Sequence, residues 1–446
     1  MKFIKSLFFN NRFFLSIALV SSSYVLGYFY SSIQAIGDIL LIILGVSSIA
    51  DLLLLYSKDG IKAERLLPKK LSKKLSNGDD NEIYITCSNQ YNFPVSLAII
   101  DEIPIQFQVR DFKIKSTLDP NGSKKLNYVL RPTDRGEFEF GALKIYAETK
   151  IGLFSRRFIF SEQAILPVFP SFKQMRKFEM YAISNRLTDI GVKKIRRLGH
   201  TMEFDQIKEY VRGDDIRSLN WKATARANSL MINQYQDERS QQVVNVIDMG
   251  RVMKLPFDGL SLLEYAINTS LVISNISLIK EDKAGLITFS NKQSVVVKPE
   301  KKRTHIRKIQ EALYNLKTNF LESDFQRMLV SLRTHLNQRS LVLLYTNFET
   351  YSGMERQLPY LQRLAADHLL VVVFFENTEM TSLIEQDSKT IEDIYTKTIA
   401  EKFSYEKRQI VKALNQRGIH TILTPPKELS VNAINKYLEL KARGLI

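Results

Sequence analysis

The stretch QQVVNVIDMG, Gln241 to Gly250, decides the fold of the C-terminal part of the chain. It is a largely apolar run without strict alternation, and it ends in a carboxylate, Asp248. Strands with apolar side chains on both faces are typical of a parallel sheet that helices cover on both sides. We therefore expect this stretch to be a central strand of such a sheet.

Further apolar runs follow, and helical patterns separate them. The runs KAGLITFS, SLVLLYTN and LLVVVFFEN predict strands, whereas RTHIRKIQEALYNLK, MERQLPYLQRLAADH and the closing KELSVNAINKYLELKARG predict helices. This alternation predicts a doubly wound α/β domain over residues 241–446. Ligands of such sheets bind at the carboxyl ends of the strands, so Asp248 and Asn347 are the first positions to inspect.

Residues 58–172 have a different pattern, with short runs of β-branched and aromatic residues. Examples are EIYITCSN and GEFEFGALKIYAET, and turn-like stretches such as DPNGS and PTDRG lie between the runs. Strands of this length and spacing predict a small antiparallel β-sandwich.

Residues 1–57 hold two long apolar segments. Phe13–Tyr30 carries no charge, and Ile39–Tyr56 carries only Asp51, which we expect near an end of the helix, in reach of water. Each segment is about as long as a helix that crosses a bilayer. A cleaved signal peptide is an alternative for the first segment, although no small-residue cleavage pattern follows it. A buried helical hairpin is an alternative for both. We expect a transmembrane helical hairpin.

The charges around these segments predict where the rest of the chain lies. The formal net charge is +16, and many of the cations flank the two apolar segments, whereas the connection Ser31–Asp38 has no Lys or Arg. The positive-inside rule then places both ends of the hairpin in the cytoplasm. Cations at such positions contact anionic lipid headgroups, so we expect a membrane partner and no nucleic acid. The single Cys87 excludes an intrachain disulfide and suits a reducing compartment.

Residues 173–240 are expected to form a linker and then a distinctive cluster, EFDQIKEYVRGDDIRSLNWKATAR, Glu203 to Arg226. We expect the paired aspartates to cap a helix over Ile216–Arg226, the only tryptophan to pack into a core or a domain junction, and the arginines to pair with acids. This arrangement would lock the β-domain to the α/β domain, and a surface for a partner protein remains open as well. The residues concerned are Glu203, Phe204, Glu209, Tyr210, Arg212, Gly213, Asp214, Asp215, Arg217, Trp221 and Arg226.

A hydrolytic or phosphoryl-transfer enzyme that uses Asp214 and Asp215 with the arginines is the alternative hypothesis. However, the sequence shows no nucleophile elbow, no Walker loop and no metal-binding histidine pair. We therefore expect no catalytic residues and no cofactor. The basic run KKIRRLG, residues 193–199, lacks interleaved aromatic residues, so we expect a solvated linker or a contact for lipid or an acidic partner.

The cluster resembles the signature of DUF58, a bacterial family of domains of unknown function. The shared features are Glu-Phe, Lys-Glu-Tyr, Gly-Asp-Asp, Arg, Trp and Ala-Arg, in that order, followed by a strand that ends in Asp248. The resemblance implies two leading membrane helices, a β-domain and a terminal domain like von Willebrand factor A. It also implies partnership with a MoxR-type AAA+ ATPase and with other membrane proteins that carry von Willebrand A domains. We thus expect a cytoplasmic adaptor, anchored in the inner membrane, that acts in assembly or maturation of envelope or other protein complexes.

A von Willebrand A domain often binds Mg²⁺ through Asp-x-Ser-x-Ser, with a further Thr and Asp from other loops. In this sequence Gly250 and Val252 replace the two serines after Asp248, and Asn347 stands where the later acid is expected. Because a hard dication needs a dense shell of oxygen ligands, the resemblance implies a degenerate metal motif that holds no metal.

Overall fold

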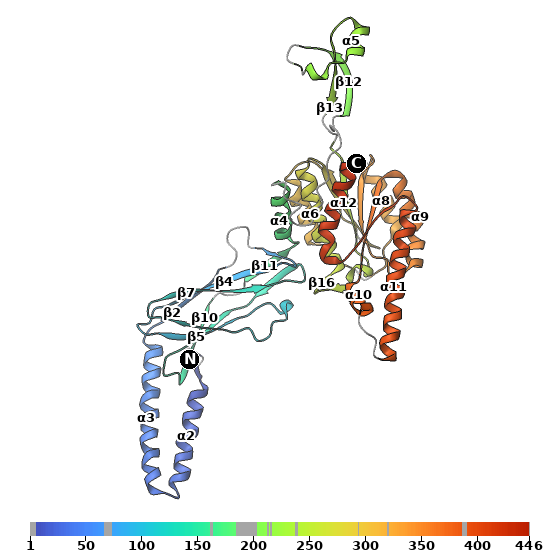
Figure 1. Ribbon diagram of the computed structural model, residues 1–446. Helices are drawn as coiled ribbons and strands as arrows, with labels where there is room; N and C mark the ends of the chain where they lie inside the picture. The colour runs from blue at the N-terminus through green and yellow to red at the C-terminus, as the bar shows by residue number, and fades with distance from the viewer. Residues whose placement is uncertain are drawn as a thin grey trace. The chain divides into compact units, whose positions relative to one another are not determined.

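The computed structural model describes residues 6–66, 74–160, 164–183, 203–211, 214, 216–236, 240–292, 294–318, 321–385 and 390–445. Contacts between residues divide the chain into two units, Met1–Phe169 and Pro170–Ile446 (Figure 1). The first unit holds two N-terminal helices and a β-rich part, and the second holds a small hairpin and an α/β domain. The protein is therefore a mixed α/β, multidomain chain, as the sequence predicts.

Unit 1 begins with β1 (Leu7–Phe9) and two antiparallel helices, α2 (Asn11–Gly27) and α3 (Ser31–Tyr56), which lie side by side (Figure 1). The segment Ile33–Tyr56 is apolar and long enough to cross a membrane, with a mean hydropathy of 2.4, and only 11% of an 18-residue stretch within it is buried. At 1.5 Å per residue, α3 is about 39 Å long. By length and composition alone, α3 is a candidate membrane span.

Asp51 ties α3 to the β-rich part of unit 1. Its carboxylate is fully buried and accepts hydrogen bonds from the backbone N–H groups of Leu153 and Phe154, both at 2.9 Å, and from the Thr149 hydroxyl. The expectation that Asp51 reaches water is therefore wrong. Its position close to the end of the helix places it against the loop before β10, where three donors replace the water it would otherwise bind.

The rest of unit 1 consists of three small sheets around one core. Period-2 alternation explains this arrangement: on β4, for example, Ile83, Ile85 and Cys87 point to the core, and the residues between them do not. The sheets are β2 (Ile61–Leu66), β4 (Asn81–Asn89) and β7 (Ser123–Leu130); β1, β10 (Phe154–Phe160), β9 (Leu143–Glu148), β5 (Val95–Asp101) and β6 (Ile114–Leu118); and β3 (Leu75–Ser76), β11 (Ala164–Phe169) and β8 (Gly136–Phe140).

The α/β domain of unit 2 contains a six-stranded sheet in the order β18 (Val296–Glu300), β17 (Lys283–Phe289), β14 (Gln242–Asp248), β19 (Leu341–Tyr345), β20 (Leu369–Phe375) and β21 (His420–Thr424). All neighbouring strands are parallel except β18, which runs antiparallel at the edge. In chain order this is 3-2-1-4-5-6, the order of a doubly wound sheet. The order reverses between β14 and β19, so the carboxyl ends of these two strands form the topological switch point.

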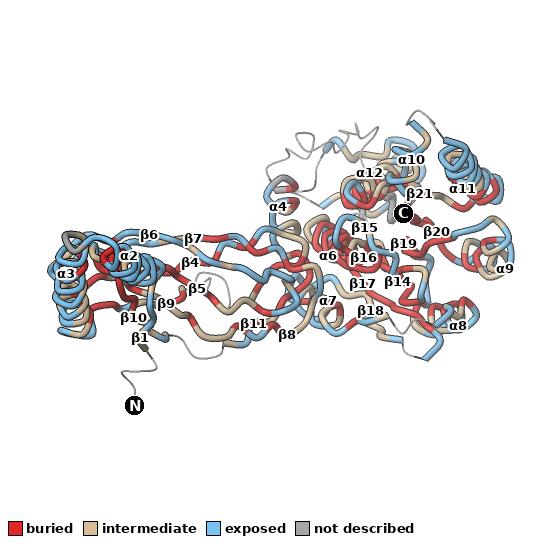
Figure 2. Tube along the Cα trace, turned by 90° about the horizontal axis from the view of Figure 1, so that it is seen from below, coloured by how far each residue is buried: buried red, intermediate tan, exposed pale blue. Residues whose placement is uncertain are grey.

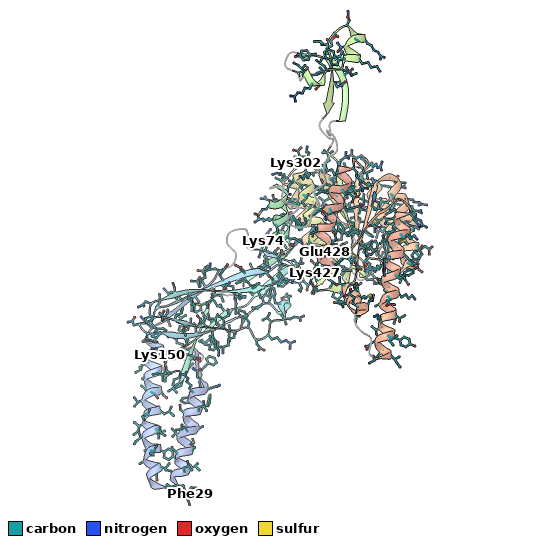
Figure 3. The ribbon with its side chains drawn as sticks, in the orientation of Figure 1. Phe29, Lys74, Lys150, Lys302, Lys427 and Glu428 are labelled. Carbon is teal, nitrogen blue, oxygen red and sulfur yellow. The ribbon has the colours of Figure 1, made fainter. Side chains whose placement is uncertain are left out.

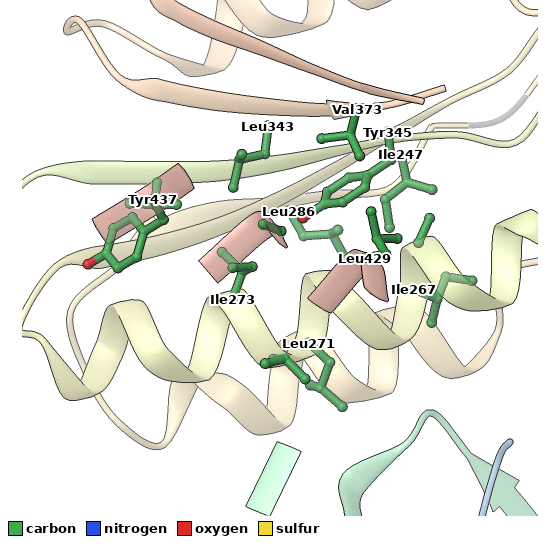
Figure 4. Close-up of a cluster of buried hydrophobic side chains, with 14 of the residues drawn as sticks. Ile247, Ile267, Leu271, Ile273, Leu286, Leu343, Tyr345, Val373, Leu429 and Tyr437 are labelled. Carbon is green, nitrogen blue, oxygen red and sulfur yellow. The ribbon is translucent and has the colours of Figure 1, made fainter. Parts of the chain in front are cut away.

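Helices cover both faces of this sheet. One face packs on α6 (Leu262–Ile279), α7 (His305–Tyr314) and α12 (Leu429–Ala442), with α4 (Phe172–Ile183) against α6; the cluster in Figure 4 belongs to this core. The other face packs on α8 (Phe325–His335), α9 (Tyr351–Asp367) and α11 (Ile391–Asn415). Figure 2 shows the central strands and α6 as buried. Although α6 is also apolar enough to cross a membrane, 94% of it is buried, so it is a core helix.

Candidate functional site

The switch point of the sheet holds a sealed carboxylate. Asp248 ends β14 with only 1% of its surface exposed. Its Oδ1 accepts from the Gly250 N–H at 2.8 Å and from the Ser323 hydroxyl, and its Oδ2 accepts from the Thr346 hydroxyl at 2.7 Å. Burial raises the pKa of Asp248 because it penalises the charged form, although the three hydrogen bonds oppose this effect.

Ser323 supplies the hydroxyl that the sequence lacks at position 250. A Cβ atom on Gly250 would lie 2.0 Å from the Ser323 Oγ, so the serine occupies the space of a side chain at that position. The backbone of Gly250 is extended, with φ −73° and ψ 173°, and any residue adopts this conformation. Space, and not backbone conformation, therefore requires glycine here.

Sequence reasoning identified Asp248, Gly250 and Asn347 but missed both hydroxyl donors. The position of Thr346 in the sequence could have indicated its role, because it directly follows β19 and precedes Asn347. No sequence pattern indicates the role of Ser323, because it comes from a loop before α8, 75 positions from Asp248. Val252 makes no hydrogen bond to the carboxylate in the described structure, but it lines a polar cavity of about 140 Å³ that Asp248 and Ser323 line as well.

The hydrogen-bond donors around Asp248 leave little room for a divalent cation. Mg²⁺ and Ca²⁺ need several oxygen ligands, and a carboxylate whose oxygens already accept three hydrogen bonds has little capacity left. Within the described ranges, no three His, Cys, Asp or Glu residues come together in a way that could hold a metal ion. Arg251 and Arg356 line the adjoining cavity together with Glu322 and Glu349. Arg251 pairs with Glu322 at 3.8 Å, so the cations there are already balanced by acids. A Mg²⁺ site of the von Willebrand A type therefore does not fit the residues around Asp248.

Asn347, at the end of β19, contacts a lysine instead. Its Oδ1 accepts from the Lys407 Nζ of α11 at 2.6 Å. Burial lowers the pKa of Lys407 to about 8, while the nearby charge of Glu349 acts in the opposite direction. The Lys407 ammonium thus lies beside Asn347, the position at which the resemblance to metal-binding von Willebrand A domains implies an acidic metal ligand.

The signature cluster forms a separate small module, which we call the hairpin module, residues 203–236. Strands β12 (Glu203–Glu209) and β13 (Met231–Gln236) pair antiparallel, with an irregularity between Phe204 and Gln206. A short 3₁₀ turn, η3 (Ile216–Ser218), and a helix, α5 (Trp221–Ala227), connect them. Arg212, Gly213 and Asp215 lie outside the described residues, and of Glu203 and Phe204 only the backbone is described.

The predicted helix over Ile216–Arg226 is wrong in its start and in its cap. The helix begins at Trp221, and Asn220 caps it by accepting from the Ala223 N–H at 3.0 Å. Asp214 instead accepts from the Val211 N–H at 3.0 Å and pairs with Lys208 at 3.2 Å. These interactions lower the pKa of Asp214, with the backbone hydrogen bond as the largest cause. A short acidic side chain bonds its nearest backbone donor, and here that donor lies in the preceding turn.

Trp221 does not pack into a core. Its side chain is 70% exposed, and Ile216 and Val211 of the same module are 68% and 63% exposed. The reason is size, since two strands and a seven-residue helix cannot enclose an indole ring. Arg226 is exposed too, Tyr210 is partly exposed and bonds Leu230 through its backbone, and Glu209 accepts from the Ser229 hydroxyl. The lock between domains stays a prediction.

Residues 206–413 match the family described as "Protein of unknown function DUF58". These residues belong to the DUF58 family. The DUF58 segment begins in β12 and ends in α11, so it includes the hairpin module from residue 206 on, Asp248, Asn347 and Lys407. The chain is also 25% identical, over 207 residues, to the "Uncharacterized protein YeaD" of Bacillus subtilis (strain 168). That match covers 45% of this chain and 50% of the relative, so the chain spans about half the length of the curated relative it matches.

The chain superimposes only poorly on the solved structures that it resembles. The VWA domain of SpRpn10 is 12% identical and covers 44% of this chain and 93% of that domain, with a TM-score of 0.26. The pilus adhesin SpaC from Lactobacillus rhamnosus GG is 13% identical and covers 47% of this chain and 31% of the adhesin, with a TM-score of 0.30. The fold assignment of the α/β domain rests on its strand order and not on these overlaps.

Proposed function

We propose that this protein is a membrane-anchored adaptor that binds a MoxR-type AAA+ ATPase through the hairpin module, in the assembly or maturation of envelope or other protein complexes. The exposure of Trp221 carries the proposal. Tryptophan and arginine dominate the binding energy of many protein interfaces, and a tryptophan that is 70% exposed has no packing role within its own module. Val211 and Ile216 add exposed apolar surface, and Arg226 adds a cation.

The helical pair of unit 1 supports the membrane anchor. Besides α3, α2 exposes large apolar side chains such as Phe14, Leu15 and Leu19, which a bilayer would cover. Cations gather at the base of the pair, beside the β-rich part, at Arg12, Lys58, Lys150 and Arg156.

The far end of the pair carries exposed aromatic residues, Tyr28 to Tyr30, and no Lys or Arg up to Asp38. Figure 3 labels Phe29 at this end and Lys150 at the base. This charge distribution supports an orientation in which the base faces the cytoplasm.

The acids of the site support an adaptor rather than an enzyme. Asp214 binds Lys208 and a backbone amide, and Asp248 is sealed by three donors. A general acid or base must instead reach a substrate atom. Among the acids that the structure describes, the hydrolytic or phosphoryl-transfer alternative therefore has no comparable support.

The test of partner binding is affinity capture with the full chain in detergent. The MoxR-type ATPase of the same organism is added with ATP or with ADP. We expect the native chain to retain the ATPase in at least one nucleotide state and Trp221→Ala to lose it. Tyr395→Ala is the matched control, because Tyr395 is an equally exposed aromatic residue, at 69%, on α11. If the native chain retains the ATPase in neither state, the proposal fails.

The orientation is tested by cysteine labelling in intact cells. Phe29→Cys should react with a membrane-impermeant maleimide from outside, whereas Lys150→Cys should react only after lysis. The native Cys87 is fully buried and contributes no background. The opposite labelling pattern would refute the cytoplasmic location of the β-rich part.

A further inference from the structure

A cavity of about 300 Å³ opens beside Lys407 at the carboxyl edge of the sheet. Its walls are largely apolar and come from the loop after β14, the end of β20, α10 (Thr378–Glu385) and α11. The apolar lining residues include Leu255, Phe257, Phe375, Met380 and Phe403. This volume is at the lower end for small-molecule sites, and it suits one or two side chains better than a large cofactor.

Lys407 lines this cavity with an ammonium group that has capacity to spare. The group has three N–H donors, and one of them is used by the Asn347 Oδ1 at 2.6 Å. Within the part of the chain that the structure describes, no second acceptor lies within hydrogen-bond distance of its Nζ, and the centre of the Phe374 ring lies 5.7 Å from the Nζ. Burial is what lowers its pKa to about 8, as expected for a cation without a full set of partners.

The charged residues around the cavity limit what it can hold. Lys407 and Arg408 come from α11, Glu349 follows β19, and Glu376 follows β20. Because the two cations and the two acids balance, a carboxylate adds only one uncompensated negative charge, whereas a phosphate dianion adds two and is repelled about twice as strongly by both glutamates. The apolar walls favour a ligand in which the negative charge adjoins an apolar group.

We propose that this cavity, the Lys407 pocket, binds a carboxylate with an adjoining apolar side chain, presented by a peptide segment of a partner protein. The carboxylate is either an acidic side chain or a free chain terminus. The Lys407 ammonium pairs with it, Asn347 holds the ammonium in place, and Arg408 lies at the rim. The pocket is separate from the hairpin module, and the proposal does not depend on the ATPase.

The test measures the reactivity of Lys407 in the full chain in detergent. Acetylation by an isotope-labelled anhydride is followed by mass spectrometry as a function of pH, which gives the pKa of this amine. A carboxylate that binds should raise the pKa by about one unit or more, and so lower the fraction of free amine roughly tenfold. Lys402, exposed on the same helix and outside the pocket, serves as the internal control.

Three probes, each at millimolar concentration, distinguish a free chain terminus from an acidic side chain. N-acetylphenylalanine models a chain terminus, N-acetylglutamylphenylalaninamide models an acidic side chain beside an apolar residue, and N-acetylphenylalaninamide carries no charge. We expect one of the two acids to protect Lys407, and the one that does so identifies the source. If neither acid protects Lys407 better than the uncharged amide, the proposal is overturned.

A variant gives an independent check. Lys407→Met keeps an apolar side chain of similar length, and because it removes the reporting amine, its binding of the protecting probe is measured by ligand-observed NMR. It should weaken this binding at least tenfold, whereas Lys402→Met should leave it unchanged. Equal binding to both variants would also refute the proposal.

Discussion

Exchange of the side chains at positions 250 and 323 tests whether Ser323 fills the space beside Asp248. The variants are Gly250→Ser, Ser323→Ala and the double variant that carries both changes. A Cβ atom on residue 250 would lie 2.0 Å from the Ser323 Oγ and 3.1 Å from the Asp248 Oδ1. The extended backbone of Gly250 accepts a serine without strain, so the collision is the effect that the single variant measures.

The expected magnitudes follow from these contacts. Gly250→Ser overpacks a buried site and displaces a hydrogen-bond donor of Asp248, which together cost about 2–5 kcal/mol. Ser323→Ala removes the donor alone and costs about 1–3 kcal/mol. The double variant returns a hydroxyl to the vacated space, so we expect a favourable coupling of about 2 kcal/mol between the two changes.

The assay is hydrogen exchange of the amides in β14 and β19, measured by mass spectrometry on the full chain in detergent. Local opening sets these exchange rates, and each 1.4 kcal/mol changes them about tenfold. Gly353→Ser is the control, because its Cβ would come no nearer than 3.2 Å to another atom, the Thr350 Oγ1. If Gly250→Ser exchanges like the native chain, or if the double variant is no better than Gly250→Ser, Ser323 does not occupy this space.

The remaining predictions concern the two buried acids Asp248 and Asp51 and the expected lack of Mg²⁺ binding. The pKa of Asp248 is raised by burial, so the folded chain favours its protonated form more than the unfolded chain does; this contribution to stability is complete below the unfolded pKa of about 3.9 and is lost as the pH rises through the folded pKa. Asp248→Asn should remove this pH dependence, by about 1.4 kcal/mol for each unit of the shift, and parallel pH profiles of native and variant protein would contradict the argument. Asp51→Ala leaves three donors without an acceptor, so we expect a loss of roughly 3 kcal/mol, seen as faster exchange in the loop before β10; unchanged exchange there would argue against the tie. Calorimetric titration with Mg²⁺ should give no site-specific heat, and stoichiometric binding would show that the oxygen set around Asp248 is sufficient after all.

The sequence could predict those features that depend on local patterns. Continuous apolar runs such as Gln241–Gly250 predicted the parallel strands, short β-branched and aromatic runs such as Glu82–Asn89 predicted the β-rich part, and the apolar length of Ile39–Tyr56 predicted the span that lies within the candidate Ile33–Tyr56. The helix cap in the hairpin module was misplaced because Asp214 and Asn220 are both favourable capping residues. Only the backbone path shows which of them lies within reach of a free helical N–H.

The functional site depended on contacts between residues far apart in the chain. The sequence predicted that Asp248 and Asn347 come at the carboxyl ends of two strands, because strand ends can be located from local hydrophobicity; the structure then pairs these strands and ends β19 at Tyr345. The tertiary structure decided that Ser323 and Thr346 seal Asp248 and that Lys407, 60 positions beyond Asn347, bonds its amide. The physical reason is that hydrogen bonds and desolvation act over a few ångströms in space, and no local pattern records which loop or helix supplies the partner.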